Sequence, residues 1–373
     1  MSAMLLLVGC SRVSGDERVV FEKPTDVSAL LESVRSVEFV PLETSDEVLI
    51  GDRSEMFLLD DGSFVVWDRG SREDGCPVLP ADYGIYHFDS SGRFINNIGR
   101  PGSGEHEYSN VSSVQIVGDD IVVFSEKGRT LRFSAEGSLI SEKQVEGLGV
   151  QSCLVPEGIL TYHGFGAGSE NRVEVIHEDG SVVGFLPTSA KVLILTPDTP
   201  VFSSDGGRVY FTDTYSPDIH VYENGTVRSA VSFDFGEAAL SERFYQFEDA
   251  MAAAQYMLSS DQFALIQRYL PGKEYQFVEV FIQKGMEVES DYGFNRAGEG
   301  WKWFSMGSVS LSPFAGSLRC LDGDVLYCLL DAKRMTGEVD AQAARLVEKA
   351  SNAEILDGLD AGDNPVVAKL CLK

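Results

Sequence analysis

A short β-hairpin recurs four times in this chain, and this recurrence constrains the fold more than any other feature. The first copy, residues 84–99, reads GIYHFDSSGRFINNIG: an alternating strand, a polar turn with a glycine, and a second strand. Alternation turns one face of each strand toward a core, and glycine gives the turn its backbone freedom. The turn glycines are 45, 43 and 45 residues apart: Gly92, Gly137, Gly180 and Gly225. Such a strand-rich period is typical of β-propeller blades, which repeat every ~40–45 residues.

Each recurring hairpin is expected to be preceded by another hairpin, because a propeller blade has four strands. In each such hairpin an Asp/Gly-type turn leads into an apolar strand that is mostly β-branched or aromatic. These hairpins are DDGSFVVWD (60–68), GDDIVVFS (118–125), PEGILTYH (156–163), DGGRVYFTD (205–213) and DGDVLYCLLD (322–331). The last two are far enough apart for two blades and an insertion, so we predict an all-β, six-bladed β-propeller. A β-sandwich is the alternative, but its strands need not recur so regularly.

The two ends of the chain are expected to meet in the last blade. Residues 34–42 and 365–372 both have strand patterns, and pairing them would close the ring and remove two open sheet edges. Two helical insertions are also expected. Apolar steps of three and four from Ser241 to Leu258 predict an amphipathic helix near blade five, with Ser241 as its N-cap, that packs against the propeller. Residues 341–355 predict a second helix before the closing strand.

The first ten residues carry a signal of export. A short apolar run ends in the tetrapeptide LVGC (7–10), which resembles the bacterial lipobox, where the cysteine is lipidated after cleavage. No basic residue precedes the run, as is expected if the natural start lies upstream of Met1. A chance apolar N-terminus with a buried cysteine is the alternative. The predicted division is a lipoprotein signal segment (1–10) ending at the lipidated Cys10, a tether (11–33) and the propeller (34–373).

The charge of the chain limits its partners. It has 58 acidic and 30 basic residues, a formal net charge of −28. Such a surface repels phosphate backbones, so we expect no nucleic-acid partner. The acidity is otherwise explained by solubility in an exposed compartment. The five cysteines other than Cys10 show no C-x-x-C or Cys/His spacing of a metal site. Five cysteines cannot all pair, so no disulfide framework is implied.

The most aromatic stretch of the chain follows the blade-five strand at residues 275–285. It reads DYGFNRAGEGWKWFSMG (291–307), and we expect it to be a loop. Exposed aromatic side chains would suit stacking on a sugar ring or gripping a peptide, which makes Trp301, Trp303 and Tyr292 candidate ligand-binding residues. The alternative is a packed loop that caps the blade.

Three aspartates recur at one blade position, at the end of the strand that follows the first turn: Asp68, Asp213 and Asp331. Carboxylates at equivalent places in a ring could converge on one pore mouth and hold calcium or another divalent cation. The alternative is that each accepts hydrogen bonds from a turn. The sequence has no G-x-S-x-G elbow, EF-hand loop or HxH pair, and of its five histidines we expect only His163 near the axis. No catalytic residue is assigned.

Several motifs together point to a family. They are FVPLETSDEVLIG (39–51), YHFDSSGRFINNIGRPGSG (86–104) followed by Glu107-Tyr108, DFG (234–236) and NPVVAKLCLK (364–373). With them the chain resembles the six-bladed, NHL-like β-propeller lipoproteins of Bacteroidetes-type bacteria. It departs from the family's Gly-Pro-Gly-Glu-Tyr, reading Gly-Glu-His-Glu-Tyr at 104–108. The resemblance implies an exported propeller anchored to the outer membrane, often associated with glycan uptake, and no established catalytic residues.

Two functions remain open from the sequence. The favoured one is a non-catalytic, lipid-anchored binding or scaffold protein of the cell envelope, without a cofactor, whose partner is a glycan, a peptide or a protein. The alternative is a lyase or hydrolase that depends on a metal ion at the propeller axis, because this fold hosts binders and enzymes alike.

Overall fold

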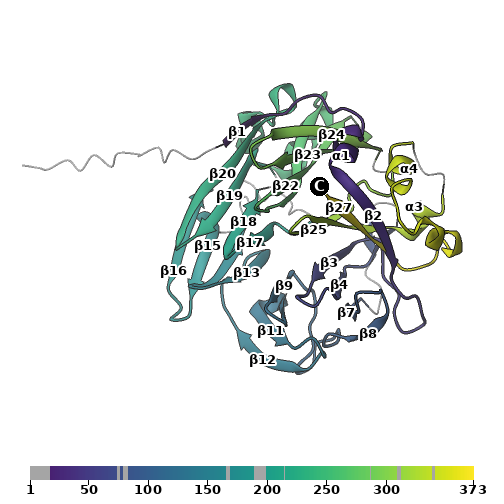
Figure 1. The fold of residues 1–373 in the computed structure, drawn as a ribbon. Coiled ribbons are helices and arrows are strands. Elements are labelled where there is room, and N and C mark those ends of the chain that lie inside the picture. Colours follow the sequence, from purple (N-terminus) through teal and green to yellow (C-terminus); the bar gives the residue numbers. More distant parts are fainter. Residues whose placement is uncertain are drawn as a thin grey trace, which may run out of the picture.

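The fold is a ring of small β-sheets around one axis (Figure 1). The computed structural model describes residues 17–373 except 74–75, 79–82, 165–168, 189–198, 214, 286, 309–311 and 338–340. Within these residues, six blades of four strands each form the ring, and blade four carries a fifth strand. The predicted six-bladed β-propeller is therefore confirmed.

Each blade has its first strand next to the axis. Blade one consists of β3 (Ser54–Leu58), β4 (Phe64–Asp68), β7 (Ile85–Phe88) and β8 (Phe94–Asn97). Blade two consists of β9 (Ser113–Val117), β10 (Asp120–Ser125), β11 (Arg129–Phe133) and β12 (Leu139–Gln144). Blade three consists of β13 (Gln151–Val155), β14 (Gly158–Tyr162), β15 (Asn171–His177) and β16 (Val182–Pro187). Blade four consists of β17 (Phe202–Asp205), β18 (Arg208–Thr212), β19 (Asp218–Glu223) and β20 (Thr226–Asp234). Blade five consists of β21 (Phe263–Leu270), β22 (Tyr275–Lys284), β23 (Glu287–Arg296) and β24 (Gly300–Ser308). Blade six consists of β25 (Leu318–Asp322), β26 (Val325–Leu330), β27 (Val366–Leu372) and β2 (Val34–Pro41).

The recurring hairpin is the outer half of blades one to four. Its turns lie between β7 and β8, β11 and β12, β15 and β16, and β19 and β20. Gly92 shows why the turn needs glycine: its φ is +87°, and a Cβ would lie 2.2 Å from the Pro41 carbonyl oxygen. Asp89 completes this turn, since its carboxylate accepts hydrogen bonds from the Ser91 and Arg93 amides at 2.8 and 3.0 Å.

The hydrophobic core is divided among the gaps between neighbouring blades. Each of these gaps is filled by apolar side chains from the two facing sheets; Val65 and Trp67 of blade one, for example, pack with Ile121 and Leu131 of blade two. Such a ring is stable only when its last gap also closes. Antiparallel pairing of β2 with β27 joins the two ends of the chain in blade six, as the sequence predicts.

The segment before β2 lies along the outer edges of blades four and five. The strand β1 (Glu17–Val20) pairs in parallel with β20, the Thr25 amide donates to the Trp303 carbonyl of blade five, and α1 (Ser28–Ser33) leads into β2. Phe21 packs edge-on against Trp303, with ring centroids 4.7 Å apart. The prediction of a tether over residues 11–33 is therefore wrong for residues 17–33, which are part of the folded propeller.

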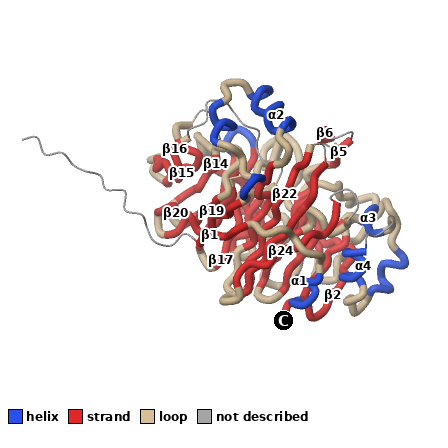
Figure 2. The backbone as a smooth tube through the Cα atoms, turned by 90° about the horizontal axis from the view of Figure 1, so that it is seen from above, coloured by secondary structure: helices blue, strands red, loops and turns tan. Residues whose placement is uncertain are grey.

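The predicted helices are shorter than expected. In place of one helix from Ser241, the structure has a 3₁₀-helix (Glu242–Gln246) and α2 (Ala250–Ser259), because Phe247 between them is extended. The N-cap of α2 is Asp249, whose carboxylate accepts from the Ala252 amide at 2.8 Å, while the Ser241 hydroxyl bonds Tyr256. α2 and the small hairpin of β5 (Ser71–Glu73) and β6 (Cys76–Val78) lie on one face of the ring (Figure 2).

The second predicted helix is also interrupted. α3 (Ala332–Met335) follows blade six's second strand, α4 (Ala341–Val347) covers the first part of the predicted range, and a 3₁₀-helix (Ala353–Gly358) follows. The break falls at Asn352, whose side chain bonds both the amide and the carbonyl of Phe39 at 3.0 and 2.8 Å. These bonds fix Asn352 in a non-helical conformation, so tertiary contacts override the helical pattern.

Candidate functional site

The first strands of the blades enclose a cavity on the propeller axis. Its volume is about 660 Å³, and residues of β3, β9, β13, β17, β21 and β25 line it. The wall is mixed: apolar side chains such as Phe57, Ile116 and Leu270 alternate with polar and charged ones. A cavity of this size and composition falls within the range of small-molecule binding sites, about 300–1,000 Å³.

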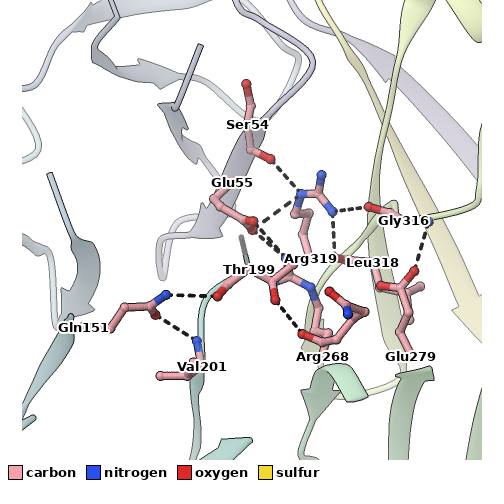
Figure 3. A network of polar contacts seen from close by, with 11 residues as sticks. Ser54, Glu55, Gln151, Thr199, Val201, Arg268, Glu279, Gly316, Leu318 and Arg319 are labelled. Atoms are coloured by element: carbon pink, nitrogen blue, oxygen red, sulfur yellow. Dashed lines mark hydrogen bonds and ion pairs between the residues drawn. The ribbon is translucent and has the colours of Figure 1, made fainter. Parts of the chain in front are cut away.

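Three buried charges from three blades meet in the wall of this cavity: Glu55 of β3, Arg268 of β21 and Arg319 of β25 (Figure 3). Arg268 Nη2 donates to both carboxylate oxygens of Glu55, at 2.9 and 2.8 Å. Arg319 Nε lies 3.6 Å from Glu55 Oε2. The three side chains are only 6 to 9% exposed, so the cluster is shielded from solvent. We refer to it below as the Glu55 cluster.

Backbone irregularities place both arginines. The β25–β26 register shifts between Leu318 and Cys320, so Arg319 is the extra residue of a bulge. The β21–β22 register shifts between Ile266 and Arg268, where Gln267 is the extra residue, so this bulge lies directly before Arg268. β-Bulges re-aim side chains and are frequent next to functional sites. Arg319 is held further by hydrogen bonds from its guanidinium to the carbonyls of Ser54 and Gly316, at 3.0 and 2.8 Å.

Electrostatics keeps the cluster charged. Burial alone would raise the pKa of Glu55, but Arg268, Arg319 and Arg69 together lower it below its usual value, so the carboxylate is ionised. Burial lowers the pKa of Arg319, and burial together with the neighbouring arginines lowers that of Arg69 to about 10. With a pKa of about 10, Arg69 remains cationic at neutral pH.

The cavity has a charged end and an acidic rim. Glu55 and Arg319 lie near the starts of β3 and β25, whereas the exposed Asp60 and Asp322 lie at the turns that follow β3 and end β25. Glu55 and Arg319 are therefore at the opposite ends of these two strands from the aspartates. Between blades three and four, the Gln151 side-chain amide donates to the Thr199 carbonyl at 3.0 Å and accepts from the Val201 amide at 2.9 Å (Figure 3). These bonds tie β13 to the segment that leads into β17.

The three predicted metal ligands do not come together. Asp68 accepts from the amides of Gly51 and Gly70, and Asp331 caps α3 by accepting from the Lys333 amide at 2.9 Å. None of the three aspartates lines the axial cavity. Over the described part of the chain, no three His, Cys, Asp or Glu side chains are grouped as a metal site would require. The prediction of a shared cation site at Asp68, Asp213 and Asp331 is therefore wrong, and the turn interpretation holds for Asp68.

Asp213 instead links two blades. It is fully buried at the end of β18, and its carboxylate pairs with Arg172 and accepts from the Tyr162 hydroxyl, both of blade three. Burial raises the pKa of Asp213 to about 6, against the opposing effect of Arg172. His163 lies 3.1 Å from Glu174 of the same blade and does not line the axial cavity, contrary to expectation.

The aromatic stretch is not a loop. It forms β23 and β24, the outer hairpin of blade five. Trp303 and Tyr292 are 4% and 0% exposed, because their rings fill the gaps to blades four and six. Trp301 is partly exposed, stacks on Trp303, and donates from its indole to Glu17 at 3.1 Å. The prediction of an exposed aromatic ligand site is therefore wrong, and the packed alternative describes these residues better.

Tyr292 still has a place behind the axial site. Its hydroxyl donates to Glu279 at 2.8 Å and accepts from the Gly316 amide at 2.9 Å. Gly316 in turn accepts from Arg319. This chain of hydrogen bonds supports the Glu55 cluster from outside the cavity. Cys10, the predicted lipidation site, lies outside the described residues.

Sequence reasoning missed all three residues of the Glu55 cluster. Arg268 and Arg319 stand in FALIQRYL and LRCLD, strand patterns that are otherwise largely apolar. A charged residue inside an apolar strand is a usable signal, because charges are almost never fully buried unless they are paired. The partner could not be read from the sequence, since Glu55 and Arg268 are 213 residues apart.

Comparison with known proteins gives a family and two structural relatives. A family model, DUF4934, a domain of unknown function, matches residues 19–370. The chain belongs to the DUF4934 family. This DUF4934 protein is similar to a candidate exported protein of Bacteroides fragilis, with a TM-score of 0.72 and 17% identity over 95% of this chain and 99% of that one. It is also similar to a DUF4221 family member from Bacteroides vulgatus, with a TM-score of 0.56 and 11% identity over 91% and 97%.

These likenesses show the fold. No curated protein matches this DUF4934 chain. Among the described residues, no helix is both long and apolar enough to cross a membrane.

Proposed function

We propose that this protein is an exported, non-catalytic binding protein of the cell envelope that holds a small organic ligand in its axial cavity. The observation that carries the proposal is the cavity itself, about 660 Å³ in volume, with a buried cluster of charges in its wall. Buried charges cost free energy unless they are paired, and such clusters at cavities are frequent at binding sites. The bulges at Arg319 and directly before Arg268 support the same interpretation.

Export and anchoring form the second part of the proposal. It is supported by the lipobox-like LVGC at 7–10 and by the name of the Bacteroides fragilis relative as a candidate exported protein. Lipidation at Cys10 would hold the propeller at the outer membrane, as in the NHL-like lipoproteins that the sequence resembles. Cells fed an alkyne fatty acid should label the protein and retain it in the membrane fraction. Loss of both in Cys10→Ala supports the anchor, whereas unchanged labelling rejects it.

A role beside glycan uptake, with a glycan, peptide or protein partner, follows from the same resemblance. In that setting the axial ligand would be a product or signal of the uptake system. A pull-down from envelope extracts with the propeller as bait tests this part, with enrichment of transporter or glycan-degrading proteins as the expected result. A bait that enriches no envelope protein rejects it.

The ligand-binding part is tested by ¹⁹F NMR with a set of fluorinated fragments that covers acidic, basic and neutral groups. At least one fragment should broaden on addition of the protein. Ser203→Trp, which places a large side chain on the cavity wall, should abolish the broadening, whereas Val182→Trp on the exposed outer strand of blade three should leave it unchanged. If no fragment broadens, or if Ser203→Trp has no effect, the axial cavity is not the binding site.

A further inference from the structure

The charges of the Glu55 cluster are unevenly matched. Two buried guanidinium groups, of Arg268 and Arg319, contact one carboxylate, that of Glu55. The neighbouring carboxylate of Glu279 is also buried, but it accepts its hydrogen bonds from the hydroxyls of Ser290 and Tyr292 and from the Gly316 amide. Among the described residues, Glu55 is therefore the only carboxylate within 4 Å of the two guanidinium groups, while Glu279 acts on Arg319 from farther away.

Arg268 has hydrogen-bonding capacity left over. Its Nη2 atom makes both bonds to Glu55, and its Nε atom has no hydrogen-bond partner among the residues that the structure describes. The residue is 6% exposed, so bulk water does not compensate for the missing bond. An unsatisfied buried donor costs about 1–3 kcal/mol, more when it is charged, and such atoms call for an explanation.

A third arginine, Arg69, adds to the positive potential around the Glu55 cluster. Arg69 lies close enough for Glu55, Arg268 and Arg319 all to affect its pKa. The chain as a whole carries a net charge of −28, so a cationic cavity end contrasts with the rest of the molecule. The acidic rim residues Asp60 and Asp322 are exposed, where solvent and salt screen their charge.

From these observations we infer that the ligand of the axial cavity is an organic carboxylate, whose carboxylate accepts hydrogen bonds from Arg268 and Arg319 while its body lies against the apolar wall. A guanidinium group matches a carboxylate by two parallel hydrogen bonds, which makes arginine the usual residue for this recognition. The apolar residues Phe57, Ile116 and Leu270 line the same cavity and give the body of the ligand its contact surface. The inference rests on the proposed function, because it assigns a ligand class to that site.

A matched pair of probes tests the ligand class by ¹⁹F NMR on the folded, unlipidated propeller. 4-(Trifluoromethyl)benzoate and 4-(trifluoromethyl)benzamide have nearly the same shape and differ in charge. The benzoate should bind at least about 10-fold more tightly than the benzamide, the ratio expected for a charge-assisted hydrogen bond. Equal binding of the two probes overturns the carboxylate inference but leaves the cavity as a binding site. If neither probe nor any other fragment binds, the proposed function itself is wrong.

Two substitutions should shift benzoate binding in opposite directions. Arg268→Lys keeps the positive charge but removes Nε, so affinity should fall about 10-fold. Glu55→Gln removes the competing carboxylate, so affinity should rise about 10-fold, and added benzoate should raise its melting temperature more than that of the wild type. Asp60→Asn at the exposed rim is the matched control, with a change below about two-fold expected. A merely structural role predicts weaker binding in both cluster variants, and that result overturns the inference.

Discussion

The covered half of the ring, blades four to six, and the open half, blades one to three, differ at their outer edges. In blade four the N-terminal segment adds a fifth strand, β1, and in blade six it supplies the outermost strand, β2. In blade five the Thr25 backbone forms hydrogen bonds with Trp303 and Ser305 of β24. In blades one to three the outermost strands β8, β12 and β16 have no further strand beside them among the described residues. The covered half thus depends on contacts between distant parts of the chain, and the open half on local hairpins.

The two halves also differ in what fills their outer strands. β16 in the open half exposes Val182 and Val183 at 53% and 44%, whereas β20 in the covered half buries Val231 and Phe233. An unpaired strand edge with exposed apolar side chains can pair with another chain. The N-terminal segment, which pairs with β20 and supplies β2, therefore covers edges that stay open in blades one to three.

The largest effect is expected at the closing strand. Phe39 of β2 is 1% exposed, and both its amide and its carbonyl bond Asn352. Phe39→Ala should lower the free energy of unfolding by about 3–5 kcal/mol, the usual cost of truncating a buried phenylalanine to alanine. Ile140→Ala on the open strand β12, where Ile140 is 52% exposed, should change it by less than about 0.5 kcal/mol. Chemical denaturation followed by circular dichroism measures both, and equal losses would contradict the comparison.

A smaller effect is expected for the segment that precedes β2. Phe21 packs against Phe235 and Trp303 with ring centroids 5.6 and 4.7 Å apart. Because Phe21 is only partly buried, Phe21→Ala should cost about 2 kcal/mol, less than a fully buried Phe. It should also speed hydrogen exchange in β20, while exchange in β12 and β16 stays as in the wild type. Uniform acceleration around the ring would show that the segment does not act locally.

Stability in the covered half should also depend on pH through Asp291 of β23. Burial raises its pKa to about 6 from a usual value of 3.8, and a hydrogen bond from Ser305 opposes this only in part. Between these two values the folded protein binds more protons than the unfolded chain, so this contribution to stability is lost as the pH rises from about 4 to 6. Asp291→Asn should remove this loss and be more stable by about 1–3 kcal/mol at pH 8. Denaturation curves that differ by the same amount at pH 4 and pH 8 would reject it.

Prediction from sequence succeeds in one half of the ring better than in the other. The open half follows from local signals, because each hairpin carries its own Asp/Gly turn, such as Asp89 with Gly92. In the covered half the pairing of β1 with β20 joins residues more than 200 positions apart, and ERVV is too short to indicate a strand. Tertiary contacts also determine that the aromatic side chains of the outer hairpin of blade five are buried, because Trp303 and Tyr292 fill gaps between blades.

The candidate site could not be predicted for the same reason. Glu55 belongs to the open half, and Arg268 and Arg319 belong to the covered half. Each is an ordinary charged residue in the sequence and becomes part of a site only when the ring closes. The Glu55 cluster therefore links the two halves where blade six adjoins blade one, and any substitution that opens blade six should also weaken ligand binding.

The smallest effect on stability is expected at the open edge itself. Val182→Lys on β16 should change the free energy of unfolding by less than about 0.5 kcal/mol, because Val182 is 53% exposed. The same substitution at Val231 on β20, which is 3% exposed and paired with Glu17, should cost about 3 kcal/mol or more, because it buries a charge. A lysine on an open edge also repels edge-to-edge pairing, so light scattering of concentrated Val182→Lys should show less association than the wild type. If Val182→Lys destabilises the fold as much as Val231→Lys, the outer edge of blade three is covered in solution, and the distinction between the two halves of the ring fails.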